Sequence, residues 1–150
     1  MDILDLERTV RPEWWLKQMK ECDWIAGQFL YTLLKEERFH RLYGEKAQVL
    51  ILADGPKLAA FCTYAEKDDI QPTELSPWMG FVYTFPEHRG HRYVGKLFEA
   101  IERIAKAEGI SEVYISANHI GLYEKYGCTF RTLMDDMDGK PSRVYVKKID

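Results

Sequence analysis

The sequence predicts an α/β (α+β) fold in which helices pack on a mixed central sheet. Apolar runs at residues 48–53 and 57–65 flank an Asp54-Gly55-Pro56 turn, a pattern typical of a β-hairpin. Further along, a strand that begins at Pro77 is followed by a long amphipathic helix and then by a strand at residues 112–117. Hairpin partners pair antiparallel and crossover partners pair in parallel, so we expect both kinds of pairing in one sheet.

The N-terminal segment predicts two helices. Pro12 stands where the first helical turn tolerates proline, and Asp23 is placed to cap the second helix. Charged residues then lead towards a break at Gly44. The apolar residues at helical spacing are Trp15, Leu16 and Met19 in the first helix and Ala26, Phe29, Leu30, Leu33 and Leu34 in the second.

The second half of the chain predicts a polar loop at residues 66–77, a helix that ends near Gly109 and a short helix at residues 119–126. It closes with a second hairpin, whose strands we expect at residues 130–135 and 143–149 around Asp138-Gly139.

Composition restricts the function classes. The 150 residues, which we interpret as one domain spanning residues 1–150, carry a net charge of −3, and this argues against nucleic acid as the main partner. The longest apolar run, residues 49–53, is far too short for a membrane span, and the N-terminus lacks a signal-peptide pattern. Three widely spaced cysteines predict no disulfide framework and favour a cytoplasmic location.

The start of the long helix predicts a phosphate site. Arg89, Arg92 and Lys96 recur at the helical step, where backbone N–H groups and the positive end of the helix dipole also favour an anion. Gly90 would let a ligand approach the backbone, and Gly95 would allow close packing on the sheet. The alternative is a solvated basic turn whose glycines serve only the backbone.

Two segments in this order carry a family resemblance. The apolar strand ends in F-P-E-H-R-G at residues 85–90, before the amphipathic helix, and Asn118 precedes L-Y-E-K-Y-G at residues 122–127. Together they resemble the GNAT superfamily of acyl-CoA-dependent N-acetyltransferases. The resemblance implies a mostly antiparallel sheet of six or seven strands flanked by helices, and acetyl-CoA as the co-substrate.

The resemblance also implies a set of cofactor-binding residues. The family pattern at the turn is Arg or Gln, two residues, Gly, one residue, then Gly or Ala. Arg89 matches it, whereas Arg92 and Val94 replace the two later positions, and Arg92 could compensate by pairing with a phosphate. The implied positions are Val82, Tyr83 and Thr84 at the strand end, Arg89, Gly90, His91, Arg92, Tyr93, Val94 and Gly95 in the turn, and Asn118 and Tyr123 downstream.

For catalysis, the resemblance implies that a primary amine attacks the thioester directly. Tyr123 matches the family's general acid, and Thr84 is the second expected catalytic position; a packed tyrosine and a plain strand residue are the alternatives. Asn118 could equally be a helix cap. The general base stays open among Asp68, Asp69, Glu74, Glu87 and the four histidines.

The resemblance places the acceptor site roughly at residues 13–43 and 66–77, without identifying the amine, which could be a small molecule or a peptide. We expect no metal site and no membrane or nucleic-acid partner, and the C-terminal hairpin could support a homodimer. Two other functions are alternatives: a non-catalytic acyl-CoA-binding or sensing module, and a dinucleotide-binding domain, which the absence of G-x-G-x-x-G disfavours.

Overall fold

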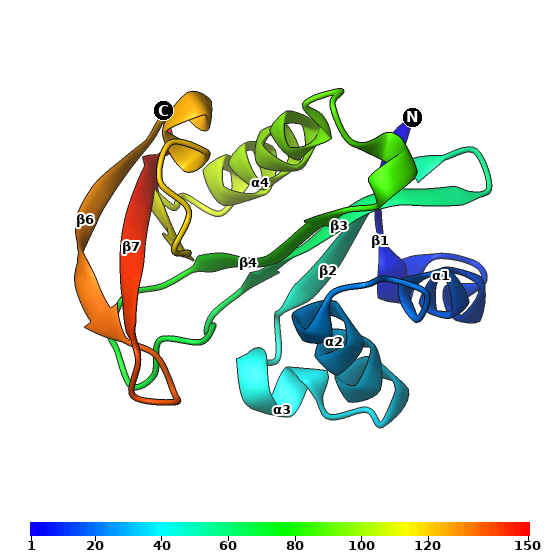
Figure 1. Cartoon of the computed structure of the whole chain (residues 1–150), viewed down its shortest axis with the longest axis horizontal. Helices are drawn as coiled ribbons and strands as arrows, with labels where there is room; N and C mark the ends of the chain where they lie inside the picture. Colours follow the sequence, from blue (N-terminus) through cyan, green and yellow to red (C-terminus); the bar gives the residue numbers. More distant parts are fainter.

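A computed structural model describes residues 1–150 and contains one seven-stranded sheet with the order β1-β2-β3-β4-β5-β7-β6 (Figure 1). The β4–β5 pair is parallel and every other neighbouring pair is antiparallel. The predicted mixed, mostly antiparallel fold is therefore confirmed. The strands are β1 (Asp2–Asp5), β2 (Gln48–Asp54), β3 (Lys57–Ala65), β4 (Trp78–Thr84), β5 (Glu112–Ser116), β6 (Cys128–Asp135) and β7 (Pro141–Lys148).

Helices cover both faces of this sheet. Figure 1 shows α4 on one side and α1, α2 and α3 on the other. Three short 3₁₀ turns complete the chain. The helical elements are η1 (Leu6–Arg8), α1 (Pro12–Met19), α2 (Ile25–Lys35), α3 (Phe39–Tyr43), η2 (Pro86–His88), α4 (Tyr93–Ala107) and η3 (Tyr123–Tyr126). No helix combines the length and the apolar character that crossing a membrane requires.

The central strands are buried on both faces, which explains their continuous apolar runs. In β2, Val49 and Ile51 pack with the core under α1, α2 and α3, whereas Leu50 and Leu52 pack with the core under α4. Successive side chains of a strand point to opposite faces, so one strand serves both cores. The two cores lie back to back across the sheet.

The sheet opens between β4 and β5. Their ladder is limited to the pairing of Trp78 with Tyr114, where the Tyr114 amide donates to the Pro77 carbonyl at 3.0 Å. Beyond this point β5 stays paired with β7 alone. Within β4 the register against β3 shifts, and Phe81 lies in the left-handed region at φ 48°, the signature of a β-bulge. The main chain of β4 after Trp78 therefore faces a gap.

Several predicted boundaries need correction. The acidic β1 and the short α3 were not predicted, because each is too short for a period and depends on packing against β2 and the α1–α3 core. The helix expected at residues 119–126 is only the η3 turn, after Gly121 at φ 93°. Asp23 does not cap α2; its carboxylate instead accepts from the Tyr83 hydroxyl at 2.5 Å.

Candidate active site

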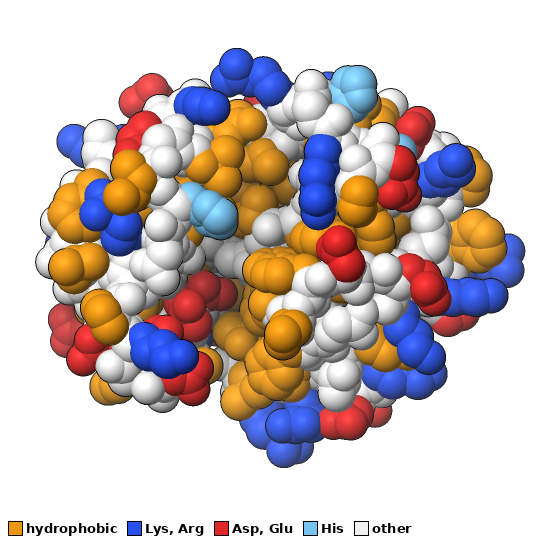
Figure 2. All heavy atoms as spheres, in the orientation of Figure 1, with side chains coloured by type: hydrophobic (Ala, Val, Ile, Leu, Met, Phe, Trp, Pro, Cys, Tyr) orange, Lys and Arg blue, Asp and Glu red, His pale blue; other side chains and the backbone are white.

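A cavity of about 430 Å³ occupies the gap between β4 and the end of β5. Its lining includes Tyr43 and Phe81, which pack with the core under α1, α2 and α3, and also Met79, Val82 and Tyr123, which pack with the core under α4. The cavity therefore crosses the sheet. Figure 2 shows a central hollow on this face, with hydrophobic side chains along it and acidic side chains at one end.

Tyr123 is buried in the cavity wall at the start of η3. Its ring packs edge-on against Phe98 at 6.2 Å and lies 5.9 Å from the Tyr145 ring. Burial raises the pKa of the Tyr123 phenol, and the nearby Cys128 and Cys62 thiols and the Asp68 carboxyl raise it further. The phenol therefore holds its proton at neutral pH, as a general acid must.

The three predicted positions at the end of β4 have different surroundings. Val82 lines the cavity, whereas Tyr83 points to the opposite face, stacks on Trp24 at 5.7 Å and donates to Asp23. The Thr84 carbonyl accepts from Arg89 Nε at 2.9 Å. Of the three side chains, only that of Val82 reaches the cavity.

Arg89 lies between η2 and the helix, not on the helix face that the spacing predicted. Besides its bond to Thr84, its guanidinium lies 5.5 Å from the centre of the Tyr83 ring and 3.9 Å from Asp23 Oδ1. It thus ties the turn to the end of β4, while its side chain stays 53% exposed.

Arg92 is the N-cap of α4 and has left-handed backbone angles, φ 58° and ψ 36°. This conformation favours glycine, the residue that the family pattern has at this position. The backbone of the turn is therefore of the glycine type although the side chain is arginine. The Arg92 guanidinium lies 5.7 Å from the centre of the Tyr126 ring and is exposed.

The rest of the turn leaves backbone donors available. α4 has no side-chain cap, and the amides of Tyr93 and Val94 have no carbonyl acceptor, whereas the Gly95 amide donates to Arg92 O at 3.0 Å. Gly90 has φ 86° and open space around its Cα, so a ligand can approach its backbone. His91 is exposed and stacks on the Tyr93 ring at 5.3 Å.

Gly95 packs differently from the prediction. A Cβ at this position would lie 3.3 Å from the Tyr126 ring, so the close neighbour is η3 and not the sheet. Tyr126 in turn stacks on Phe98 of α4 at 5.3 Å. Gly95 therefore brings the helix start and the Tyr123 segment together, although they are far apart in sequence.

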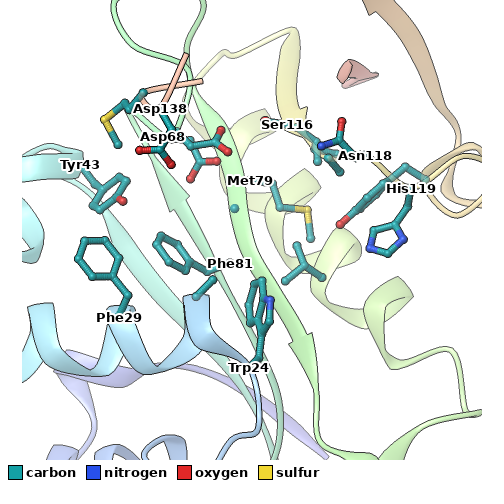
Figure 3. Close-up of a pocket in the computed structure, with 18 residues that line it drawn as sticks. Trp24, Phe29, Tyr43, Asp68, Met79, Phe81, Ser116, Asn118, His119 and Asp138 are labelled. Carbon is teal, nitrogen blue, oxygen red and sulfur yellow. The ribbon is translucent and has the colours of Figure 1, made fainter. Parts of the chain in front are cut away.

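Asn118 lines the cavity beside Ser116, directly after β5 (Figure 3). Its Oδ1 accepts from the Arg143 amide at 3.3 Å, so it holds β7 and does not cap a helix. The neighbouring His119 also lines the cavity, and its carbonyl accepts from the Tyr145 hydroxyl at 2.8 Å.

Besides His119, two of the candidate bases line the cavity. Asp68 is 6% exposed and lines the wall together with Asp69, whereas Glu74 and Glu87 are exposed and lie outside it. Burial raises the pKa of Asp68, and the adjacent Asp69 charge raises it further. Burial also raises the pKa of Asp69, although the nearby Ser116 side chain opposes this change.

Sequence reasoning missed the feature that admits these carboxyls. A Cβ at Gly80, in the middle of β4, would clash with the Asp68 carboxyl group, so the carboxyl occupies the space of a β4 side chain. An isolated glycine in an apolar strand is a known sign of close approach, and this signal was available in the sequence. Phe81, Met137 and Asp138 also line the cavity and lie outside the segments predicted for the acceptor.

The comparisons with known proteins agree with this geometry. The sequence matches the model of the acetyltransferase (GNAT) family over residues 5–128. No curated protein sequence matches the chain significantly. Among solved structures, an aminoglycoside 6'-N-acetyltransferase complexed with coenzyme A has a TM-score of 0.71 at 12% identity, covering 100% of this chain and 98% of that one.

Two further structures have the same fold. A chimeric spermidine N-acetyltransferase based on that of Vibrio cholerae has a TM-score of 0.69 at 15% identity, over 98% of this chain and 94% of that chain. A ribosomal-protein alanine N-acetyltransferase from Escherichia coli has a TM-score of 0.63 at 17% identity, over 99% and 94%. Because the family model covers most of the sequence, the chain belongs to the GNAT acetyltransferase family and is an acetyl-CoA-dependent acyltransferase.

Proposed function

We propose that this protein transfers an acetyl group from acetyl-CoA to a primary amine by direct attack in the cavity between β4 and β5. The observation that carries the proposal is that the cavity crosses the sheet, with Tyr123 on the α4 side and Tyr43 and Phe81 on the other. Two substrates can therefore meet there from opposite faces. Such an arrangement removes the entropic cost of bringing them together at the moment of reaction.

The residues at the start of α4 fit the diphosphate of coenzyme A. The unpaired amides of Tyr93 and Val94, the open approach at Gly90 and the positive helix end all favour an anion. Arg92 and Lys96, both exposed, would add charge to this site. The unpaired main chain of β4 at Val82 would hold the arm that leads into the cavity. Acetyl-CoA supplies an acyl group activated as a thioester.

Tyr123 would act as the general acid. As the amine nitrogen forms its bond to the carbonyl carbon, the carbon–sulfur bond breaks and its electron pair stays on sulfur. Tyr123 gives its proton to this thiolate and recovers one from solvent. Burial raises the pKa of the phenol, and it raises the pKa of a thiol in the same surroundings, so the two groups stay matched.

Replacing Tyr123 by Phe tests this role. We expect Tyr123→Phe to lower kcat by about 100-fold, within the range typical of general acids, and to leave the Kd for acetyl-CoA unchanged. Tyr126→Phe is the matched control, because Tyr126 lies on the same 3₁₀ turn, keeps its ring packing and has no hydrogen bond from its hydroxyl. Equal turnover of the two variants would remove Tyr123 from the mechanism.

Other expectations stay predictions. The role of Thr84 would fall to its amide or hydroxyl, since its carbonyl already accepts from Arg89. A homodimer through the C-terminal hairpin would use β6, the outer strand of the sheet, where Phe130 and Leu133 are exposed. The three unpaired cysteines favour a cytoplasmic location. Light scattering during size-exclusion chromatography would measure the oligomeric state.

A further inference from the structure

The cavity is acidic at one end, which we call its acceptor side. Its charged side chains are Asp68, Asp69 and Asp138, and no lysine or arginine lines it. The carboxyl groups come from the β3–β4 loop and from the turn between β6 and β7, which the Met137 amide joins to the Asp69 carbonyl at 2.9 Å. Figure 3 shows Asp68 and Asp138 side by side at one end. A cation is the charge that fits this end.

The opposite wall is aromatic. Trp24 and Phe29 from the α2 region, Tyr43 from α3 and Phe81 from β4 line it. The Phe81 ring organises the wall, since it contacts Tyr43 edge-on at 5.5 Å and Trp24 edge-on at 6.4 Å. Phe29 is 43% exposed at the rim. This wall offers apolar contact and aromatic ring faces, and it carries no charged group.

The Asp68–Asp69 pair is held in position, and one of its carboxyl oxygens lacks a hydrogen bond. Gly80 provides the space for the Asp68 carboxyl directly over β4, beside the bulge at Phe81. Oδ1 of Asp69 is buried and has no hydrogen-bond partner. A buried acceptor without a partner is costly, which favours a proton on this carboxyl pair over a second negative charge.

We propose that this cavity accepts a monoamine with a compact apolar or aromatic body, whose ammonium group binds the Asp68–Asp69 pair and gives up a proton there. This inference rests on the proposed N-acetyltransferase function and specifies its acceptor. The ammonium lies at the acidic end, and the apolar body lies against Trp24, Phe29, Tyr43 and Phe81.

The arrangement disfavours polycationic acceptors. The carboxyls form a single cluster, so a second ammonium of a polyamine would exchange its hydration for a weaker cation–π contact with the aromatic wall, without a carboxylate. A polyhydroxylated amine would bury hydroxyl groups against the same wall, where the Tyr43 hydroxyl and the Trp24 indole N–H are the only polar side-chain groups, so most of them would lack partners. Each such group costs about 1–3 kcal/mol in proteins, which corresponds to roughly 10–100-fold in affinity.

The proton balance assigns one task to each group. The ammonium donates one proton to the carboxylate of the Asp68–Asp69 pair, which releases it to solvent after turnover, and the neutral nitrogen attacks the thioester carbonyl carbon. The thiolate takes the Tyr123 proton, and the second nitrogen proton passes to solvent as the amide forms. The raised pKa of Asp68 brings its basicity closer to that of a useful base at neutral pH. The ionisable side chains around it are Asp69, Asp138, Tyr43 and Tyr123.

The direct test compares acceptors in a thiol-release assay with acetyl-CoA. We expect kcat/KM for 2-phenylethylamine to exceed that for 1,4-diaminobutane, spermidine and kanamycin by at least about tenfold. A preference for any of the three polycations would overturn the inference while leaving the proposed function intact. If acetyl-CoA does not bind, or no amine releases thiol, the proposed function and the inference both fail.

Variants locate the selectivity. Phe29→Ala, at a partly exposed rim position, should raise KM for 2-phenylethylamine about tenfold and leave KM for acetyl-CoA unchanged. Asp68→Asn should lower kcat by about 100-fold and remove the acidic limb of the kcat/KM pH profile, with an unchanged Kd for acetyl-CoA. Glu74→Gln, an exposed carboxylate of the same loop outside the cavity, is the control and should match the parent. A parent-like pH profile in Asp68→Asn would exclude the proton-accepting role.

Discussion

The proposed cofactor side and the proposed acceptor side of the cavity are built in different ways. On the proposed cofactor side, backbone amides at the start of α4 and the unpaired edge of β4 would form the site, within one stretch from Trp78 to Gly95. On the acceptor side, side chains from α2, α3, the β3–β4 loop and the β6–β7 turn converge. A ligand that is constant across a family can be held by backbone, whereas one that varies needs side chains.

A substitution at Gly80 should have the largest effect on the acceptor side while sparing the cofactor side. Gly80→Ala places a methyl group against the Asp68 carboxyl, and we expect turnover to fall about 100-fold and stability by about 2 kcal/mol. Acetyl-CoA affinity should stay unchanged, because Gly80 lies outside the turn. Turnover and isothermal titration calorimetry measure the two sides separately.

The control for Gly80 is a double-mutant cycle with Asp68→Ala. Truncating Asp68 removes the group that the methyl would meet, so Gly80→Ala should then cost little further stability. Coupling below about 0.5 kcal/mol in denaturant unfolding would show that the carboxyl does not occupy the Gly80 space.

The same contrast explains what the sequence could predict. The strand from Trp78, the basic turn and the apolar face of α4 were predictable because their signals lie within one segment. The β2–β3 hairpin was predictable for the same reason, from two apolar runs around one turn. The aromatic wall was not, because Phe29 looks like any apolar residue of an amphipathic helix until α2 is placed beside β4.

The β3–β4 loop is a second case in which the sequence did not predict burial. From the sequence, Asp68, Asp69 and Glu74 were equal candidates, and only the fold buries Asp68, half-buries Asp69 and leaves Glu74 exposed. The left-handed Arg92 was beyond prediction for another reason, since nothing in its local sequence demands the conformation that glycine usually supplies.

The pH dependence of the free energy of unfolding offers a second, smaller test on the acceptor side. Burial raises the pKa of Asp68 in the folded state, so the folded protein keeps a proton that the unfolded chain loses above about pH 4. Stability should therefore fall as pH rises from about 4 towards the folded-state pKa. Asp68→Asn should match the parent near pH 4 and exceed it by on the order of 1–2 kcal/mol at pH 7, measured by urea unfolding.

Such a variant would be more stable and less active, with its stability gain confined to neutral pH. The pKa values of Asp69, Tyr43 and Tyr123, which lie near this group, are also raised, so Glu74→Gln provides the baseline for the rest of the loop. A parallel displacement of the whole stability curve in Asp68→Asn would contradict a raised pKa for this carboxyl.

On the cofactor side, Arg89→Ala should weaken acetyl-CoA binding by roughly tenfold, about 1.4 kcal/mol. The loss follows because Arg89 joins the turn to the Thr84 carbonyl and adds positive charge beside it. KM for the amine should stay unchanged. Arg103→Ala removes the same charge from an exposed position further along α4 and should leave the Kd close to that of the parent. Equal losses in both variants would reduce the role of Arg89 to general charge.

The finest test separates the backbone of Arg92 from its side chain. Arg92→Gly and Arg92→Ala both remove the guanidinium, but only glycine relieves the left-handed conformation at φ 58°. We expect the glycine variant to be about 1 kcal/mol more stable than the alanine variant in urea unfolding. Both should bind acetyl-CoA a few-fold more weakly, and with a smaller salt dependence than the parent, if the guanidinium reaches a phosphate. Unchanged affinity and salt dependence in both would leave the backbone amides of the turn as the whole of the phosphate site.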